Sequence, residues 1–238
     1  MSLYIGTAGW ALPRMHRARF GGGGSNLARY ATQLNAAEIN TSFYRPHKPA
    51  IYARWAAAVP ADFRFAVKMP KAITHEARLK GASALLDAFL EQSAALGGKR
   101  GLLLVQLPPS HVFEARPART FFGLLRRRFS GPVVCEPRHA SWFEEGADRL
   151  LKDLHISRAA ADPARVPAAA EPGGDPRLAY FRWHGSPRMY YSDYDAAALD
   201  ALAAQVRASR AAQVWCMFDN TTLGHATANA LAMRKLLG

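Results

Sequence analysis

The sequence predicts an α/β fold, specifically a single (β/α)8 TIM barrel with a closed, parallel sheet of eight strands. Short apolar runs typical of strands alternate with stretches of helical periodicity along the whole chain. Eight strands fit within 238 residues, and no low-complexity stretch divides the composition, so we expect one domain over residues 1–238. The alternative is an open, doubly wound sheet. It would usually carry fewer strands, and no G-x-G-x-x-G opens the first helix.

The strands are expected where apolar, β-branched and aromatic residues run together between turn signals. In chain order the predicted strands are residues 3–7, 37–40, 63–68, 102–106, 132–136, 156–162, 178–184 and 213–218. The predicted helices are residues 26–34 with Asn26 as cap, 49–57, a helix capped by Ser83 and ended by Gly97 and Gly98, 121–129, 145–154, a helix capped by Asp195, and 226–237. Residues 163–176 hold four prolines and two glycines, so the helix after strand six is expected to be weak or missing.

The chain is strongly basic, with 31 Lys and Arg against 18 Asp and Glu and a formal net charge of +13. Such a surface could attract nucleic acid, an anionic membrane or phosphorylated substrates. The alternative is compositional bias, since the arginines are dispersed over many predicted helices. The densest run, Arg126 to Arg128, falls at a helix end, where cations suit the helix dipole.

The cysteine usage and the chain start favour a reducing, cytoplasmic location. Cys135 and Cys216 each lie in an apolar run without C-x-x-C spacing, which predicts buried free thiols. The first residues begin a strand and show no signal-peptide pattern. A membrane-spanning helix needs about 20 consecutive apolar residues, and no apolar run in the sequence approaches that length, so we expect no membrane partner. No pattern bears on the number of subunits.

Polar residues gather where the predicted strands end, which is where barrels of this class carry their active sites. In chain order they are Thr7 with Trp10, Glu38 with Asn40, Lys68, Gln106, Glu136 with Arg138 and His139, Asp162, Arg182 with His184, and Asp219 with Asn220. Because charged residues are rarely buried without partners, this set predicts a functional pocket. A structural network of mutual ion pairs is the alternative.

The candidate catalytic residues are Glu38, Glu136 and His184. Two carboxylates across a pocket are what glycoside hydrolysis needs, and histidine can serve as acid or base near neutral pH. Alternatively, Lys68, Arg138 or Arg182 could hold the two glutamates in ion pairs.

The candidate substrate-binding residues combine cations, amides, imidazoles and aromatic rings. Arginine forks bind carboxylate or phosphate, and aromatic rings can stack on a sugar or a base, although rings in loops can equally cover the core. The set is Trp10, Asn40, Tyr44, Lys68, His75, Gln106, Arg138, His139, Trp142, Arg182, Tyr190 and Asn220. We expect no metal ion, because no H-x-x-x-H or H-x-H spacing occurs, and no bound cofactor.

Seven motifs carry a resemblance to a known family. They are residues 5–10 (IGTAGW), 37–44 (AEINTSFY), 65–68 (FAVK) with 73–75 (ITH), 106–109 (QLPP), 136–142 (EPRHASW), 180–185 (YFRWHG) and 218–220 (FDN). In this order they resemble the YecE-like proteins, the domain of unknown function 72 family, over essentially the whole chain.

The resemblance implies a TIM-barrel fold and no defined activity. It places family motif positions at Glu38, Asn40, Lys68, His75, Gln106, Glu136, Arg138, His139, Arg182, His184 and Asn220. Two features depart from the family pattern. Asp219 stands where a second asparagine is expected, and residues 13–24 form a basic, glycine-rich loop in place of an aromatic-proline entry.

Two function classes follow. The first is a hydrolase or isomerase acting on a small anionic, sugar-like or nucleotide-like molecule at the strand ends. The second is a nucleic-acid-binding or processing barrel that uses its basic surface. The strand-end chemistry favours the first.

Overall fold

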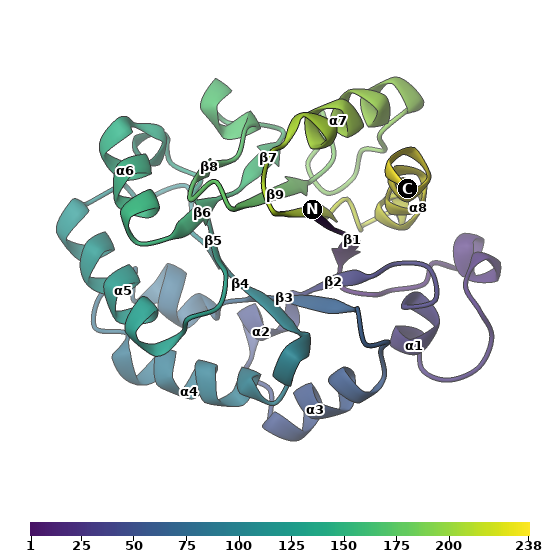
Figure 1. Cartoon of the computed structure of the whole chain (residues 1–238), viewed down its shortest axis with the longest axis horizontal. Coiled ribbons are helices and arrows are strands. Elements are labelled where there is room, and N and C mark those ends of the chain that lie inside the picture. Colours follow the sequence, from purple (N-terminus) through teal and green to yellow (C-terminus); the bar gives the residue numbers. More distant parts are fainter.

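The computed structural model describes residues 1–238 and has one nearly closed, ten-stranded sheet wrapped by helices (Figure 1). The strands are β1 (Ser2–Ala8), β2 (Ala36–Ile39), β3 (Arg64–Lys68), β4 (Arg100–Gln106), β5 (Val133–Glu136), β6 (Ile156–Arg158), β7 (Ala160–Asp162), β8 (Gly173–Gly174), β9 (Leu178–Trp183) and β10 (Gln213–Phe218). The α-helices are α1 (Asn26–Tyr30), α2 (Thr41–Tyr44), α3 (Pro49–Ala57), α4 (Ser83–Ala94), α5 (Ala115–Arg128), α6 (Glu145–Asp153), α7 (Ala196–Ala208) and α8 (His225–Leu237). Shorter helical turns are η1 (Arg14–Arg19), the π-helical η2 (Ala72–Glu76), η3 (Gly97–Lys99), η4 (Ala140–Phe143) and η5 (Pro167–Ala170).

The sheet order corrects the predicted fold class. The strands follow the order β7-β9-β10-β1-β2-β3-β4-β5-β6-β8, and all pairs are parallel except β6 with β8. The prediction of a closed, parallel, eight-stranded TIM barrel is therefore wrong. Its sixth strand is divided at Ala159: β6 pairs with β5, whereas β7 pairs with β9. The chain thus passes from β6, which lies next to the edge strand β8, to the opposite edge strand β7, and β6 does not pair with β7.

The extra strand β8 comes from the interval that the prolines and glycines predicted to be irregular. Gly174 has a φ of +64°, and a Cβ there would lie 2.3 Å from the carbonyl oxygen of Ile156. Only glycine allows this close approach, through which β8 pairs antiparallel with β6. The weak helix expected after strand six is the single turn η5.

The apolar core has two layers, one on each face of the sheet. The larger layer lies between the sheet and the surrounding helices. The smaller one fills the interior, where the ring centroid of Trp215 lies 4.5 Å from that of Tyr4 and 6.2 Å from that of Tyr180. Small residues, Ala36 and Ala66, complete this layer on β2 and β3. The packed interior therefore forms a floor beneath the strand ends.

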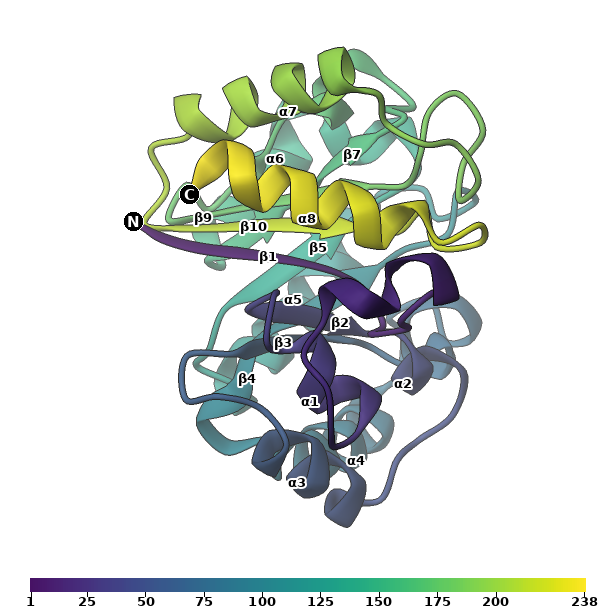
Figure 2. The same ribbon diagram turned by 90° about the vertical axis from the view of Figure 1, so that its right-hand side faces the viewer.

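The parallel strands bring their carboxyl ends to one end of the sheet. Figure 2 shows this direction, with β1 and β10 running side by side from the N-terminus at the left. No helix combines the length and the apolar character that crossing a bilayer requires. The end at which the parallel strands finish is where α/β sheets bind their ligands.

Candidate functional site

Eight polar side chains meet at the carboxyl ends of the strands, and we call them the polar cluster. Each lies at the last position of a strand or in the loop that follows it, except Glu38 and Arg182, which lie one residue earlier. The polar cluster consists of Glu38, Lys68, Gln106, Glu136, Arg138, Arg182, His184 and Asp219. The structure therefore brings these strand-end side chains together at one end of the sheet.

Arg182 is the centre of the polar cluster. Its Nε and Nη2 donate to the two carboxylate oxygens of Glu38 at 2.9 and 2.7 Å. Its Nη1 lies 3.3 Å from Oε2 of Glu136, and its Nη2 lies 2.9 Å from Oδ2 of Asp219. The Tyr180 hydroxyl also donates to Glu38, at 2.8 Å. One fully buried guanidinium thus balances three carboxylates, so Glu38 is held in an ion pair.

Glu136 has its two oxygens surrounded by donors. Gln106 Nε2 donates to Oε2 at 2.9 Å, and Arg138 Nη2 lies 2.7 Å from Oε1. His184 Nε2 lies 3.0 Å from Oε1, while its Nδ1 lies 3.0 Å from Oδ2 of Asp219. The imidazole therefore bridges two carboxylates.

These contacts set the charge of the buried groups. Burial alone would raise the pKa of the Glu136 carboxyl, but Arg138 and Arg182 outweigh it and hold that pKa well below its ordinary value. Burial is also the largest influence on Asp219 and would raise its pKa, but Arg182, His184 and Lys68 together outweigh it, so the pKa of Asp219 is lowered. Both carboxylates are consequently ionised at neutral pH. Neither can serve as the protonated acid that a glycosidase needs.

The polar cluster has a lower and an upper layer. Glu38, Arg182, His184 and Glu136 are at most 1% exposed and form the lower layer. The upper layer reaches solvent slightly: Lys68 is 7% exposed, Gln106 8% and Asp219 6%, and the Arg138 side chain is 9% exposed. Only the upper layer can contact a ligand without rearrangement.

Lys68 differs from the other cations of the polar cluster because its ammonium has no carboxylate within ion-pairing distance. Its Nζ lies 4.4 Å above the ring centroid of Phe43. Burial, then the charge of Arg182, lowers the pKa of Lys68 to about 8, although Glu38 acts in the opposite direction. An amine with free donors therefore remains at the top of the polar cluster.

The π-helical turn η2 brings His75 to the same region. The His75 ring packs edge-on against Phe43 with 4.9 Å between centroids, and its Nδ1 lies 2.9 Å from Thr74 Oγ1. Burial, then the charges of Lys68 and Arg138, lowers the pKa of His75. Single π-turns in helical segments are frequent at functional sites.

The remaining candidate residues take other places. Trp10 packs edge-on against Trp55, with 5.1 Å between ring centroids, on the helix side of the sheet. Trp142 is completely buried and donates from Nε1 to the carbonyl oxygen of His111. His139 accepts from the Ser141 backbone N–H and caps η4. These three side chains support the structure around the site and do not enter the polar cluster.

Three further candidates lie at or near the rim. Tyr44 is 71% exposed. Tyr190 packs edge-on against His184, with 5.6 Å between ring centroids, and burial raises the pKa of its phenol. Asn40 follows β2, and its Oδ1 is buried without a partner.

Asn220 anchors the loop above the polar cluster. Its Nδ2 donates to the Ser192 carbonyl at 2.9 Å and to Asn229 Oδ1 at 2.8 Å, which ties the segment after β9 to α8. Its own Oδ1 is buried without a partner. This amide therefore holds the loop that carries Tyr190.

Two residues that contact the site were not among the candidate catalytic or substrate-binding residues. Asp219 was recognised only as a strand-end residue, yet it binds both Arg182 and His184. Tyr180 lies inside a strand, so its polar group was overlooked. The alternation of side chains offered a signal for Tyr180, because it stands two positions from Arg182 and must share its face of the sheet.

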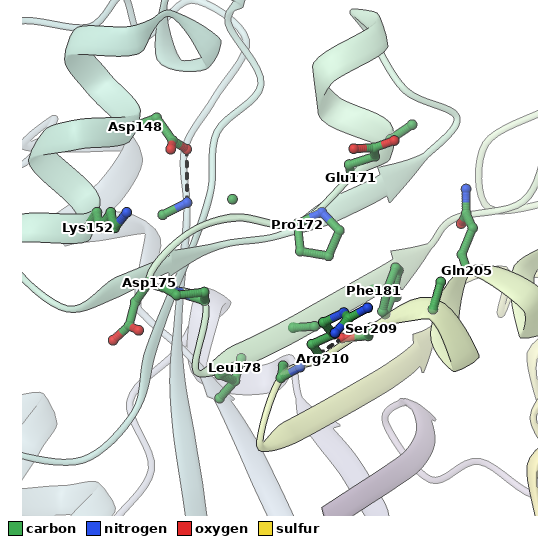
Figure 3. Close-up of a pocket in the computed structure, with 17 residues that line it drawn as sticks. Asp148, Lys152, Glu171, Pro172, Asp175, Leu178, Phe181, Gln205, Ser209 and Arg210 are labelled. Atoms are coloured by element: carbon green, nitrogen blue, oxygen red, sulfur yellow. Dashed lines mark hydrogen bonds between the residues drawn. The ribbon is translucent and has the colours of Figure 1, made fainter. Parts of the chain in front are cut away.

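A separate cavity of about 540 Å³ opens between α6 and α7, beside the segment that contains β8 (Figure 3). Asp148, whose Oδ1 accepts from the backbone N–H of Gly174 at 2.9 Å, lies on one wall, and Gln205 of α7 lies on another. Its lining contains no member of the polar cluster. The cavity is thus distinct from the strand-end site.

Charged and polar side chains at the carboxyl ends of a nearly closed, mostly parallel sheet define an α/β protein with a strand-end polar site. The seven motifs of the sequence fall on these strands and the loops after them. The chain belongs to the family described as "Protein of unknown function DUF72", whose profile matches residues 4–238. The resemblance seen in the sequence motifs is therefore confirmed.

Curated relatives and solved structures agree with this membership. The chain is 32% identical over 173 residues to "UPF0759 protein YecE" of Escherichia coli K12, and the match covers 70% of this chain and 61% of that protein. The chain is 33% identical over 156 residues to the E. coli O157:H7 protein of the same description, and this match covers 64% of this chain and 55% of that protein. The chain thus matches less than two thirds of the length of either relative.

The structural relatives cover the chain more completely. A crystal structure of a DUF72 family protein from Enterococcus faecalis V583 has a TM-score of 0.82 and 24% identity, covering 99% of this chain and 95% of that one. The crystal structure of a DUF72 family protein from Thermotoga maritima MSB8 has a TM-score of 0.81 and 23% identity, and the match covers 100% of this chain and 99% of that one. At this identity the likeness shows a shared fold.

Proposed function

We propose that this protein is an enzyme that acts on a small anionic molecule at the carboxyl ends of its strands. The upper layer of the polar cluster is the proposed contact surface, with Lys68 and Arg138 binding the negative charge and Gln106 orienting the molecule. The nearly buried, unpaired ammonium of Lys68 is the observation that carries the proposal. A buried cation without a partner destabilises a fold, and such groups are characteristic of functional sites.

The contacts around the glutamates favour some roles over others. Both oxygens of Glu38 accept hydrogen bonds from Arg182, so we assign Glu38 to positioning Arg182. Because the lowered pKa of Glu136 keeps it ionised, the paired-carboxylate route to glycoside hydrolysis loses support. His184, which lies between Glu136 and Asp219, remains the proposed acid or base; because it is fully buried, this role requires a rearrangement of the upper layer.

The basic surface gives less support to a nucleic-acid-binding function. In its densest run, Arg126 donates to the backbone carbonyls of Leu154 and Gly131, and Arg128 pairs with Asp87 at 2.9 Å. These two guanidinium groups hold α5 against its neighbours and are not free to neutralise phosphates.

Thermal unfolding with a ligand panel tests the proposal. The panel contains sugar phosphates, nucleotides, short carboxylates and short oligonucleotides at low and high salt, with wild type, Lys68→Met and the control Lys235→Met. Lys235 is exposed at the end of α8. A ligand at about 100 times its Kd adds about 2.7 kcal/mol, or about 5 °C for a chain of this length.

We expect a small anion to stabilise wild type and Lys235→Met but not Lys68→Met, with little dependence on salt. Equal stabilisation of all three proteins, or none by any small anion, would overturn the proposal. Stabilisation by oligonucleotides alone, equal in all three and confined to low salt, would instead indicate binding by the basic surface.

A further inference from the structure

The surroundings of Lys68 hold its amine at a fixed place. The residue ends β3, and its carbonyl oxygen accepts from the Ser42 hydroxyl at 2.6 Å, while the same hydroxyl contacts the Ile39 carbonyl at 2.9 Å. Phe43, next in sequence to Ser42, lies under Nζ at 4.4 Å. The side chain therefore presents its amine at the upper layer, with no carboxylate bound to it.

We infer that Lys68 Nζ forms an imine with the carbonyl carbon of a small anionic aldehyde or ketone. This inference rests on the proposed function and names the substrate class of the same site. The Nζ lone pair forms the C–N bond, and one Nζ proton passes to the former carbonyl oxygen. The nitrogen lone pair then expels that oxygen, which takes a second proton from solvent and leaves as water. The product is an iminium that keeps one proton on nitrogen.

The protonation of Lys68 agrees with a nucleophilic role. With a pKa of about 8, roughly a quarter of the amine is neutral at a pH of about 7.5. An exposed lysine of ordinary pKa is neutral in only about one molecule in a thousand at that pH. The attacking form is therefore available at Lys68 without another base.

The charges around Lys68 suit both the substrate and the product. Arg138, whose Nη1 is directed toward Met189 Sδ at 3.8 Å, offers a guanidinium beside the rim for the anionic group. The iminium keeps the positive charge at the position of Nζ, where Glu38, Glu136 and Asp219 favour a cation. Imine formation therefore preserves the charge balance of the polar cluster.

Reductive trapping tests the inference. Glyoxylate, a small anionic aldehyde, is incubated with the full chain and cyanoborohydride at a pH of about 7.5, and modified lysines are located by peptide mass spectrometry. We expect the carboxymethyl group to appear on Lys68 at least about tenfold faster than on Lys235, which serves as an internal reference. Lys68→Met should show only the surface reaction.

A second measurement separates this inference from the proposed function. Glycolate has the charge and size of glyoxylate but no aldehyde group, and it is tested by thermal unfolding on wild type, Lys68→Arg and Lys68→Met. If glycolate stabilises only wild type and Lys68→Arg, and glyoxylate labels Lys68 no faster than Lys235, the anion site stands and the imine is refuted. If labelling is uniform and neither glycolate nor any other small anion of the panel stabilises wild type, both proposals are refuted.

Discussion

Replacing Arg182 by methionine is expected to destabilise the fold by about 3–5 kcal/mol, the usual effect of removing one partner from a buried ion pair. Methionine keeps much of the side-chain volume but leaves Glu38, Glu136 and Asp219 without their shared cation. Unfolding entropy scales to about 0.5 kcal/mol per kelvin for a chain of this length, so the Tm should fall by about 6–10 °C.

Urea unfolding at neutral pH measures this change, with Arg149→Met as the matched control. Arg149 forms an exposed pair with Glu145 along α6, and its loss should change stability by less than about 0.5 kcal/mol. Adding Glu38→Gln to Arg182→Met should recover part of the loss, because one unpaired charge is removed. A loss below about 1 kcal/mol for Arg182→Met would refute the view that Arg182 balances the three carboxylates.

Three further predictions concern stability. Folding lowers the pKa of Lys68 from 10.5 to about 8, so the unfolded chain binds more protons between these values and wild-type stability rises with pH there. Lys68→Met should therefore be more stable than wild type by up to about 3 kcal/mol at a pH of about 7. Urea unfolding should show this difference in stability becoming smaller by a pH of about 10. A difference that does not change with pH would contradict the lowered pKa of Lys68. Gly6→Ala should destabilise by at least about 3 kcal/mol in the same assay, because its Cβ would lie 1.9 Å from the Ala36 carbonyl oxygen, whereas Gly22→Ala, with nothing within 4 Å, should be nearly neutral. Asn220→Ala should speed proteolysis of residues 185–194, since it releases their anchor on α8; unchanged cleavage would speak against that role.

Much of the secondary structure could be predicted because apolar periodicity and turn residues act locally. The predicted helix 49–57 and strand 213–218 match α3 and β10, and Asp195 caps α7 by accepting from the Ala198 N–H at 2.8 Å. Two predicted helix caps are wrong. Ser25, not Asn26, accepts a hydrogen bond from the Ala28 N–H of α1, and no side chain caps the start of α4 at Ser83. A helix start depends on one hydrogen bond, which neighbouring polar residues can supply equally well.

The closure of the sheet could not be predicted from the same signals. The run 156–162 has the composition of one strand, but its two halves pair with different neighbours. Which neighbour a residue binds depends on the arrangement of the whole sheet, and composition does not record it. The two-residue strand β8 was missed because glycines carry no apolar pattern.

The strand-end rule placed most of the polar cluster correctly, since parallel strands bring their carboxyl ends together whatever the side chains are. It could not separate residues that enter the polar cluster from those that turn away. Trp142 and His139 follow the same strand as Arg138, yet one is buried in the core and the other caps a turn. The direction of a loop side chain depends on contacts distant in sequence.

The central claim is that Lys68 is an unpaired, reactive amine at the top of the polar cluster. The most direct measurement is a pH titration of the protein labelled with ¹³C at the lysine ε position, followed by NMR, with Lys68→Met used to assign the resonance. We predict that the Lys68 resonance titrates with a midpoint of about 8. A midpoint near the ordinary lysine value of about 10.4 would contradict the claim, because it would mean that the ammonium is paired or fully solvated.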